Sequence, residues 1–514
     1  MTYISVAYLF VFLPVVMLAY QFCPQKKRWI VLLAASWIFA FSLSRFLILW
    51  MFLTTGIAYG VGRYIGSMQQ GDLSRKLFKK KKKQLMKLGV TGVLLILIVL
   101  KYSNFVLSTV VGLIDLFGAG ISYHPLHLLT PIGISYYTLE AISYLVDVER
   151  GEIRPEKNLG RFAMYISFFP KLMEGPISRY QDVQKDMHEM KSITFDSLRK
   201  GYLRILWGLF MKLTIADHLA MPVRLIIRLH ADDGFLCAVG AVACALQLYG
   251  DFAGTIEIAI GSAEIFGIDL PENFRQPFFA KNVTDFWRKW HITLGAFART
   301  YIFYPIAFSK PVSNLSRRFK RSGHKIIAKY TGTILGLLGV WFVIGIWHGP
   351  TWTNVLYGLY YFTWSLLEVF LEKPFERWCV DHHLDVNGFG VRLFRFIKLF
   401  LIFSLGEFFF WSNDAAKGLY ALSSIFTRFS LHGIGSKLSF LGMDTYDFVQ
   451  VAVCVLVLFR VDVQKEKGVN LFEKYRAKSL PVRWTMVFVL IFAVIFFGAY
   501  GPGYTAEAMM YAGF

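Results

Sequence analysis

The chain has 514 residues, of which 55% are hydrophobic, 17% aromatic and 17% charged. Soluble domains carry about 25% charged residues, so this composition and a mean hydropathy of +0.48 exclude an ordinary soluble protein. The net charge of +21 comes from 55 basic and 34 acidic residues. Because the basic residues gather in short segments between apolar runs, they indicate membrane orientation and contact with anionic lipid. They do not indicate nucleic acid as a partner.

Apolar runs recur along the whole chain, and several are long enough to span a membrane. A spanning helix needs about 20 apolar residues, and open strands cannot lie in lipid, so an all-α polytopic membrane protein is predicted. The segments of suitable length are 4–22, 45–66, 89–117, 201–227, 234–262, 330–347, 351–371, 393–411 and 483–499. Segment 4–22 follows an uncharged leader and lacks a small-x-small cleavage pattern, so we expect a retained helix rather than a signal peptide.

Three basic segments give the predicted orientation. They are Lys26-Lys27-Arg28, residues 75–87 with the run Lys79 to Lys83, and Arg317-Arg318-Phe319-Lys320-Arg321. If all three are cytoplasmic loops, the N-terminus is extracytoplasmic and residues 44–46 form a tight outer hairpin. The lysine run also fits a docking patch for an acidic carrier protein or an acyl-CoA, and the sequence leaves both interpretations open.

The chain contains neither an internal repeat nor a long linker, so residues 1–514 are predicted to form one integral membrane domain. Residues 1–118 alternate apolar helices with basic loops and are expected to be scaffold. Pro, Gly and charged residues interrupt the apolar runs of 121–371, and such sequence is tolerated at membrane depth only where it is buried or faces water. We therefore expect 121–371 to build the site, and 393–514 to supply further scaffold helices and a tail at 500–504 that breaks the last helix.

The stretch Asp285-Phe-Trp-Arg-Lys-Trp-His291 lies in a segment whose spacing predicts one amphipathic helix over 284–301, capped by Thr284. Its apolar face would hold Phe286, Trp290, Leu294, Phe297 and Tyr301, with Arg288 and Arg299 on the opposite face. His291 would lie at the edge of the apolar face beside Trp287. Taken alone, it fits a hydrogen-bonded histidine of the protein core, and the alternative is a ring that looks into a wet pocket.

The stretch Trp347-His-Gly-Pro350 ends a charge-free run that begins at Thr331. Proline cannot continue a helix, and another apolar helix is predicted at once, with Asn354 in its first turn. His348 is therefore expected at a break between two membrane helices, where an imidazole stays uncharged and can act as a base. The spacing does not show whether His291 and His348 face one cavity.

Four stretches together resemble the membrane-bound O-acyltransferases, in particular the bacterial branch with alginate O-acetyltransferase and the teichoic-acid D-alanyl transfer protein. They are 131–138 with 144–147, 174–180, 249–254 running through Asn273, Phe274 and Pro277 to 285–291, and 347–349 with Trp352. Their order and separations match over nearly the whole chain. The resemblance implies about eleven spanning helices of bilayer length, with re-entrant or interfacial helices, around a central funnel.

The resemblance also implies roles for individual residues. It makes His348 the essential histidine and His291 a supporting one, which would orient the acceptor or stabilise the oxyanion. Other residues at motif positions or beside the histidines are expected either to position the substrate or to brace the tunnel. They are Trp287, Trp290, Trp347, Asn354, Glu174, Arg179, Tyr180 and Asp251.

The activity implied is transfer of an acyl group, in the first place acetyl, from a cytoplasmic thioester to a hydroxyl of an extracytoplasmic polysaccharide or partner protein. The donor would be acetyl-CoA or an acyl carrier protein, with no tightly bound cofactor. The five cysteines lack paired spacing, so neither a disulfide framework nor a metal site is predicted. No G-x-S-x-G nucleophile motif is present, and the resemblance to the polysaccharide branch implies an extracytoplasmic partner of the SGNH esterase-like type that completes delivery. The expected location is the cytoplasmic (inner) membrane of a bacterium, crossed many times.

Three other functions stay open. D-alanyl transfer to teichoic acid is an alternative within the family, although the length of 514 residues favours the alginate-acetylase-like group. A transporter or flippase without acyl chemistry would also have broken helices and polar residues at membrane depth. A scaffolding subunit of an envelope complex would not depend on either histidine.

Overall fold

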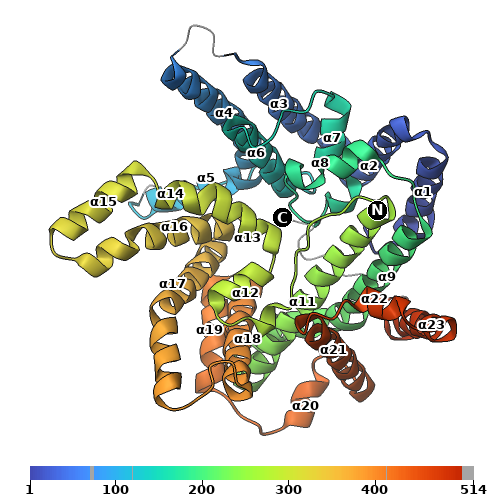
Figure 1. The fold of residues 1–514 in the computed structure, drawn as a ribbon. Helices are drawn as coiled ribbons and strands as arrows, with labels where there is room; N and C mark the ends of the chain where they lie inside the picture. Colours follow the sequence, from blue (N-terminus) through green and yellow to red (C-terminus); the bar gives the residue numbers. More distant parts are fainter. Residues whose placement is uncertain (70–73, 119, 413, 501–514) are drawn as a thin grey trace. The chain divides into compact units, whose positions relative to one another are not determined.

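The structure is a computed structural model that describes residues 1–69, 74–118, 120–412 and 414–500. Every regular element in this part of the chain is a helix (Figure 1), which confirms the predicted all-α fold. Contacts divide the chain into two compact units. Among the described residues, unit 1 comprises Met1–Ile205 and Thr255–Pro271, and unit 2 comprises Leu206–Gly254 and the residues from Glu272 to Tyr500. The predicted organisation as a single domain stays a prediction, and most of the predicted tail at 500–504 lies outside the described residues.

Five helical stretches among the described residues are long and apolar enough to cross a membrane. They are Gln25–Ser67, Arg75–Asp115, Gly234–Ile265, Lys325–His348 and Leu480–Phe497, and a shorter apolar stretch covers Ala7–Phe22. These stretches coincide with six of the predicted spans. The predicted spans at 201–227, 351–371 and 393–411 are helical too, and the total of about eleven crossings stays a prediction.

Unit 1 is built from α1 to α8 and the first part of α9. Their bounds are α1 Leu13–Phe22, α2 Arg28–Ser44, α3 Ile48–Ser67, α4 Arg75–Leu97, α5 Ser103–Asp115, α6 Ile134–Arg150, α7 Leu159–Ser167, α8 Tyr180–Glu189 and α9 Phe195–Met211. Helices α3, α4 and α6 pack against one another (Figure 1). A short 3-10 turn, Arg45–Leu47, joins α2 to α3, which confirms the tight link predicted at 44–46.

Unit 2 contains the remaining helices. Their bounds are α10 Asp217–Leu229, α12 Val283–Lys289, α13 Ile292–Ala298, α14 Tyr304–Ala307, α15 Lys310–Arg321, α16 Lys325–His348, α17 Trp352–Asp381, α18 Phe389–Trp411, α19 Ala415–Thr427, α20 Ile434–Ser439, α21 Thr445–Glu466, α22 Leu471–Arg476 and α23 Leu480–Phe497. Helix α11 (Gly234–Ile265) contributes residues to both units. Helices α15, α16 and α17 pack in sequence order (Figure 1).

Two of the basic segments predicted as loops are helical. The lysine run at 79–83 lies on α4, which begins at Arg75 after Ser74 accepts a hydrogen bond from the Leu77 amide (3.3 Å). The segment 317–321 likewise ends α15, whose start is capped by Ser309. An N-cap side chain satisfies an amide at the start of a helix, and lysine and arginine are good helix formers. The two segments therefore extend helices instead of linking them.

Candidate active site

His348 is the last residue of α16, and the predicted helix break follows it directly. Thr351 caps the next helix, α17, by accepting a hydrogen bond from the Asn354 amide (3.3 Å). The two helices are in close contact near this turn, since a Cβ added to Gly345 would lie 2.5 Å from the Asn354 carbonyl oxygen. The prediction of a break between two helices is therefore confirmed, and the side chain of His348 is held at a tight helical hairpin.

His291 lies at a second break, and here the predicted single helix over 284–301 is wrong. Helix α12 ends at Lys289, His291 adopts a left-handed conformation (φ 45°, ψ 54°), and α13 begins at Ile292. The cap of α12 is Asn282, which accepts from the Asp285 amide (2.7 Å), and not Thr284. A left-handed residue other than glycine is uncommon and persists only where its surroundings hold it.

Asn273 holds this break. Its backbone oxygen accepts from the Ile292 amide (2.9 Å), and its side-chain Oδ1 accepts from the amide and the hydroxyl of Thr293 (3.1 and 2.9 Å). Asn273 thus satisfies donors that the start of a helix otherwise leaves unpaired. The same Oδ1 lies 3.1 Å from Nδ1 of His291. Because a backbone amide already donates to this atom, it is an acceptor, and Nδ1 of His291 must carry the proton.

Both histidines line one cavity of about 260 Å³. On one side it is bounded by residues of α12, α13 and the segment after them, including Trp287, Trp290 and His291. On the other side lie Leu337, Val340, Trp341, Ile344 and His348 of α16. These positions recur every three or four residues, so they share one face of the helix. The sequence left open whether the two rings meet at one cavity, and the structure brings them together.

Aromatic rings surround the two imidazoles. Trp347 lies against both, with ring centroids 6.0 Å from His291 and 5.2 Å from His348. Trp287 packs edge-on against Trp341 (4.8 Å). Its indole N–H is buried and has no hydrogen-bond partner among the described residues. An indole N–H can only donate, so Trp287 offers a donor beside the cavity.

Charge in the cavity is one-sided. Among the described residues no Asp or Glu lines it, whereas Arg288 and Arg299 do. His291 is buried, with 4% of its surface exposed. Burial lowers the pKa of its imidazole well below the ordinary value, and the nearby His348 lowers it further. With Nδ1 protonated and the ring uncharged, Nε2 carries a lone pair, and it has no hydrogen-bond partner among the described residues.

Comparison with known proteins identifies the family of this chain. The model of the membrane-bound O-acyltransferase family matches residues 156–406. The probable alginate O-acetylase AlgI of Azotobacter vinelandii is 30% identical over 467 residues, which cover 88% of this chain and 84% of that protein. The chain belongs to the membrane-bound O-acyltransferase family. It is therefore an O-acyltransferase and a multi-pass membrane protein.

Two further relatives of this membrane-bound O-acyltransferase carry other names. The peptidoglycan O-acetyltransferase of Helicobacter pylori is 30% identical over 272 residues, which cover 46% of this chain and 47% of that protein. The teichoic acid D-alanyltransferase of Bacillus subtilis is 28% identical over 271 residues, which cover 50% of this chain and 65% of that protein. Both matches are partial, so neither names the acceptor of this chain.

Several motif residues of this membrane-bound O-acyltransferase lie in buried ion pairs or helix ends. Asp251 pairs with Lys212 (2.6 Å), which also contacts Asp217 (2.6 Å), and all three side chains are buried. Asn354 is buried in the first turn of α17, and its side-chain nitrogen lies against Gly349. The described residues that line the cavity do not include Asp251, Asn354 or Trp347.

The motif residues of unit 1 have structural contacts. Glu174 is fully buried. The amide of Arg179 donates to Asp182 (3.1 Å) at the start of α8. Tyr180 donates to the carboxylate of Glu156, a residue to which the sequence analysis assigned no role. The assignment of Glu174, Arg179 and Tyr180 to the tunnel stays a prediction.

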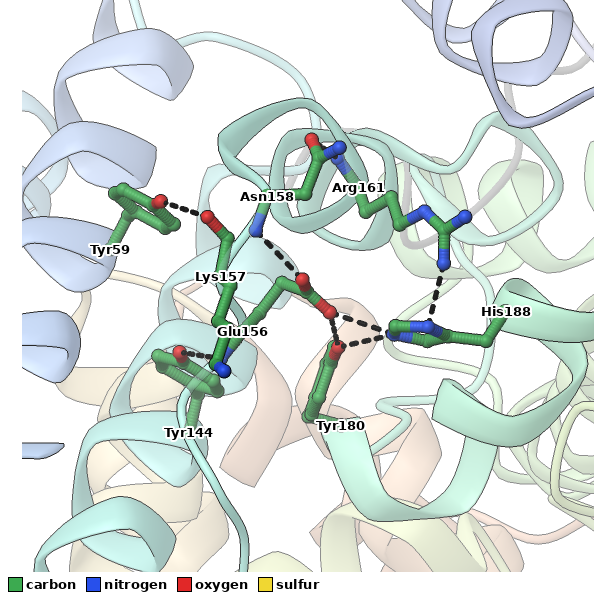
Figure 2. A network of polar contacts seen from close by, with 8 residues as sticks. All are labelled: Tyr59, Tyr144, Glu156, Lys157, Asn158, Arg161, Tyr180 and His188. Atoms are coloured by element: carbon green, nitrogen blue, oxygen red, sulfur yellow. Dashed lines mark hydrogen bonds and ion pairs between the residues drawn. The ribbon is translucent and has the colours of Figure 1, made fainter. Parts of the chain in front are cut away.

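Figure 2 shows the network around Glu156. One carboxylate oxygen accepts hydrogen bonds from the Tyr180 hydroxyl and from Nε2 of His188 (2.7 Å). The other accepts a hydrogen bond from the Asn158 amide (2.8 Å). Arg161 lies 2.6 Å from Nδ1 of His188. A guanidinium only donates, so Nδ1 accepts and Nε2 carries the proton. Burial alone would raise the pKa of Glu156, but these hydrogen bonds outweigh it and hold the pKa below its ordinary value.

Glu407 of α18 is a buried acid that sequence reasoning missed. Its side chain is fully buried, and Oε1 accepts hydrogen bonds from Tyr357 (2.8 Å) and Tyr361 (3.0 Å). The ring of Tyr357 lies 5.4 Å from that of His348. A lone acid inside an apolar run is a signal of function or of a buried polar cluster, and this signal was present in the sequence. No group of three or more His, Cys, Asp or Glu among the described residues is arranged to hold a metal ion.

Proposed function

We propose that this membrane-bound O-acyltransferase moves an acetyl group from a cytoplasmic thioester to a hydroxyl of an extracytoplasmic polysaccharide or partner protein, across the cytoplasmic membrane of a bacterium. The observation that supports it most is the cavity lined by both His291 and His348. The donor is acetyl-CoA or an acylated carrier protein, and no tightly bound cofactor takes part. An extracytoplasmic esterase-like protein of the SGNH type would complete delivery to the polymer, and the N-terminus would be extracytoplasmic.

His348 is the proposed general base. It takes the proton of the acceptor hydroxyl while the hydroxyl oxygen forms a bond to the thioester carbonyl carbon. The carbon–sulfur bond then breaks, the thiolate leaves, and the proton held by His348 returns to it as a thiol. General-base catalysis of this kind contributes about 10²–10⁴-fold. Because one imidazole holds the proton between the two steps, the cycle consumes and releases no net proton at this residue.

His291 has a narrower role than the resemblance implied. Its Nδ1 proton is directed to Asn273, so a neutral His291 offers only the lone pair of Nε2 to the cavity. That lone pair accepts a hydrogen bond from a second donor of the acceptor molecule, beside the reacting hydroxyl, and so orients the acceptor. It does not donate to an oxyanion. The buried indole N–H of Trp287 is a donor that fits the oxyanion role.

Acetyl is preferred as the acyl group because the A. vinelandii relative, which matches over most of both chains, is named an O-acetylase. D-alanyl transfer is the second candidate, supported by the partial match to the B. subtilis D-alanyltransferase. Labelled acetyl-CoA, acetylated carrier protein and D-alanylated carrier protein, each offered to the purified protein, distinguish these donors.

The decisive test is His348→Ala in purified protein reconstituted in lipid, with transfer of label from the thioester to an acceptor alcohol as the readout. We expect loss of transfer by about 10²-fold or more, with unchanged insertion and thermal stability. His432→Ala, at an exposed histidine of the same unit, is the matched control and should retain full transfer. Full transfer by His348→Ala would remove the proposed base. If the parent protein transports the thioester without cleaving it, the transporter alternative is favoured.

A further inference from the structure

Arg288 and Arg299 are the only acidic or basic side chains other than histidine among the described residues that line the cavity. Arg288 lies in the last turn of α12, and Arg299 begins a π-helical segment, Arg299–Phe303, that follows α13. Both side chains are exposed, so they lie at the open rim of the cavity rather than in its buried part. Single π-helical turns within helices are frequent at functional sites.

We propose that these two arginines bind an oxyanion, a phosphate or a carboxylate, carried by one of the two substrates. This inference rests on the proposed function and names a recognition element of the same site. A guanidinium presents parallel N–H donors that match both anions. The two arginines therefore hold the charged part of a substrate at the rim while its reacting group lies between the histidines.

The contrast with neighbouring cations supports this interpretation. Lys289, next to Arg288 in the sequence, pairs with Glu466 (3.1 Å). Lys398 of the same unit pairs with Glu368 (2.9 Å). Arg288 and Arg299 have no ion pair in the part of the chain that the structure describes, and no acid lines the cavity beside them. Two like charges at one rim repel each other, and a bound anion would relieve that repulsion.

The size of the cavity indicates which part of a substrate it holds. At about 260 Å³ it is near the lower end for a small-molecule site, so it accommodates a thioester end and one alcohol rather than a whole donor or polymer. The remainder of each substrate has to extend past the rim. Coenzyme A and carrier-bound pantetheine both carry a phosphate, and a uronic-acid polymer carries a carboxylate on each sugar.

Binding to the His348→Ala variant tests the proposal without relying on catalysis. In that background the double substitution Arg288→Gln with Arg299→Gln is compared with Arg288→Lys with Arg299→Lys. Arg317→Gln, at an exposed arginine of α15 that does not line this cavity, is the matched control. The donor probes are acetyl-CoA and acetyl-pantetheine, which lacks phosphate. The acceptor probes are a uronic-acid hexasaccharide and a glucose hexasaccharide.

We expect the glutamine pair to weaken binding of one charged probe by about 10-fold or more and to leave its neutral counterpart unchanged. A loss confined to acetyl-CoA assigns the phosphate of the donor, and a loss confined to the uronic-acid probe assigns the carboxylate of the acceptor. The lysine pair should lose less, and Arg317→Gln should match the parent. If neither charged probe is bound more tightly than its neutral counterpart, or neither depends on the arginines, the proposal is wrong. Arginine-dependent binding by a parent protein that transfers no acyl group would instead contradict only the proposed function.

Discussion

His188 of unit 1 and His291 of unit 2 are hydrogen-bonded in different ways. His188 accepts from Arg161 at Nδ1 (2.6 Å) and donates from Nε2 to Glu156 (2.7 Å), as Figure 2 shows. His291 donates from Nδ1 to Asn273 (3.1 Å), and its Nε2 is buried without a hydrogen-bond partner among the described residues. Both nitrogens of the first ring are occupied, whereas the second ring keeps one lone pair.

Exposure gives the opposite impression of the two rings. The side chain of His188 is 45% exposed, and His291 is 4% exposed. Solvent access alone would therefore select His188 as the reactive residue. A buried lone pair without a hydrogen-bond partner lowers the stability of the folded protein. Beside a cavity, that cost is offset when a bound substrate donates a hydrogen bond to the lone pair. Hydrogen-bond occupancy, more than exposure, distinguishes a binding residue from a structural one.

Replacing the two histidines separately should show the largest difference. His291→Leu removes the hydrogen-bond acceptor that orients the acceptor molecule, and misplacement of a reacting group by about 1 Å costs about 10²-fold. We therefore expect transfer to fall by about 10²-fold in His291→Leu and to change by less than about 3-fold in His188→Leu. Initial rates of transfer in reconstituted protein measure both. Equal losses of transfer rate in the two variants would show that the unpaired Nε2 of His291 does not contribute to function.

Asn273 allows a sharper test of the state of His291. In Asn273→Asp all three hydrogen bonds can still be accepted, but the added negative charge favours the imidazolium and raises the pKa of His291. A protonated Nε2 cannot accept a hydrogen bond. Transfer by this variant relative to the parent should therefore fall progressively as the pH decreases from about 8 to 6, the range in which histidine titrates near its ordinary value. The parent keeps His291 neutral there because burial lowers its pKa.

The matched variant Asn273→Ala should behave differently. It leaves the amide of Thr293 without its acceptor (3.1 Å in the parent), and a buried unsatisfied donor costs about 1–3 kcal/mol. We expect a lower unfolding temperature and a loss of transfer of about 10-fold that does not depend on pH, because no charge is added. A pH profile shared by both Asn273 variants would contradict the assigned tautomer.

The two helix breaks show what the sequence could predict. The break after His348 is local, because Pro350 lacks the amide that a helix needs, and it was predicted. The break at His291 depends on Asn273, 18 residues earlier in the chain. No local signal near His291 marks it, since the apolar spacing from Phe286 to Phe297 is that of an unbroken helix. The rings of Phe286 and Phe297 are both buried, as the spacing predicted, even though the helix between them is interrupted.

The composition of the cavity was less predictable than its histidines. Helical spacing assigned Arg288 and Arg299 to the face opposite the apolar stripe, whereas the structure places them on the same cavity as His291. The contact between α16 and the α12–α13 segment decides this, and residues far apart in the sequence carry no periodicity that relates them. Glu407 was visible as a lone acid in an apolar run, but its partners Tyr357 and Tyr361 lie on another helix.

The smallest expected effects concern Glu156 of unit 1, and they are on stability rather than transfer. Tyr180→Phe removes a hydrogen bond to a charged carboxylate, which is worth about 1.5–3 kcal/mol. The pKa of Glu156 is below its ordinary value in the folded protein. The stabilisation from this carboxylate is therefore fully present above its unfolded-state pKa, and it is lost as the pH falls through the lower folded-state pKa.

The difference in unfolding temperature between the parent and Tyr180→Phe should accordingly be constant near neutral pH and shrink below about pH 4.5. Tyr144→Phe is the matched control, because the hydroxyl of Tyr144 accepts from the backbone amide of Glu156 (3.0 Å) and does not contact its carboxylate. Its destabilisation should be the same at every pH. Thermal unfolding in detergent between pH 3.5 and 7 measures both variants. A Tyr180→Phe difference that persists undiminished at the lowest pH would show that the hydrogen bond stabilises the protein without drawing on the charge of Glu156.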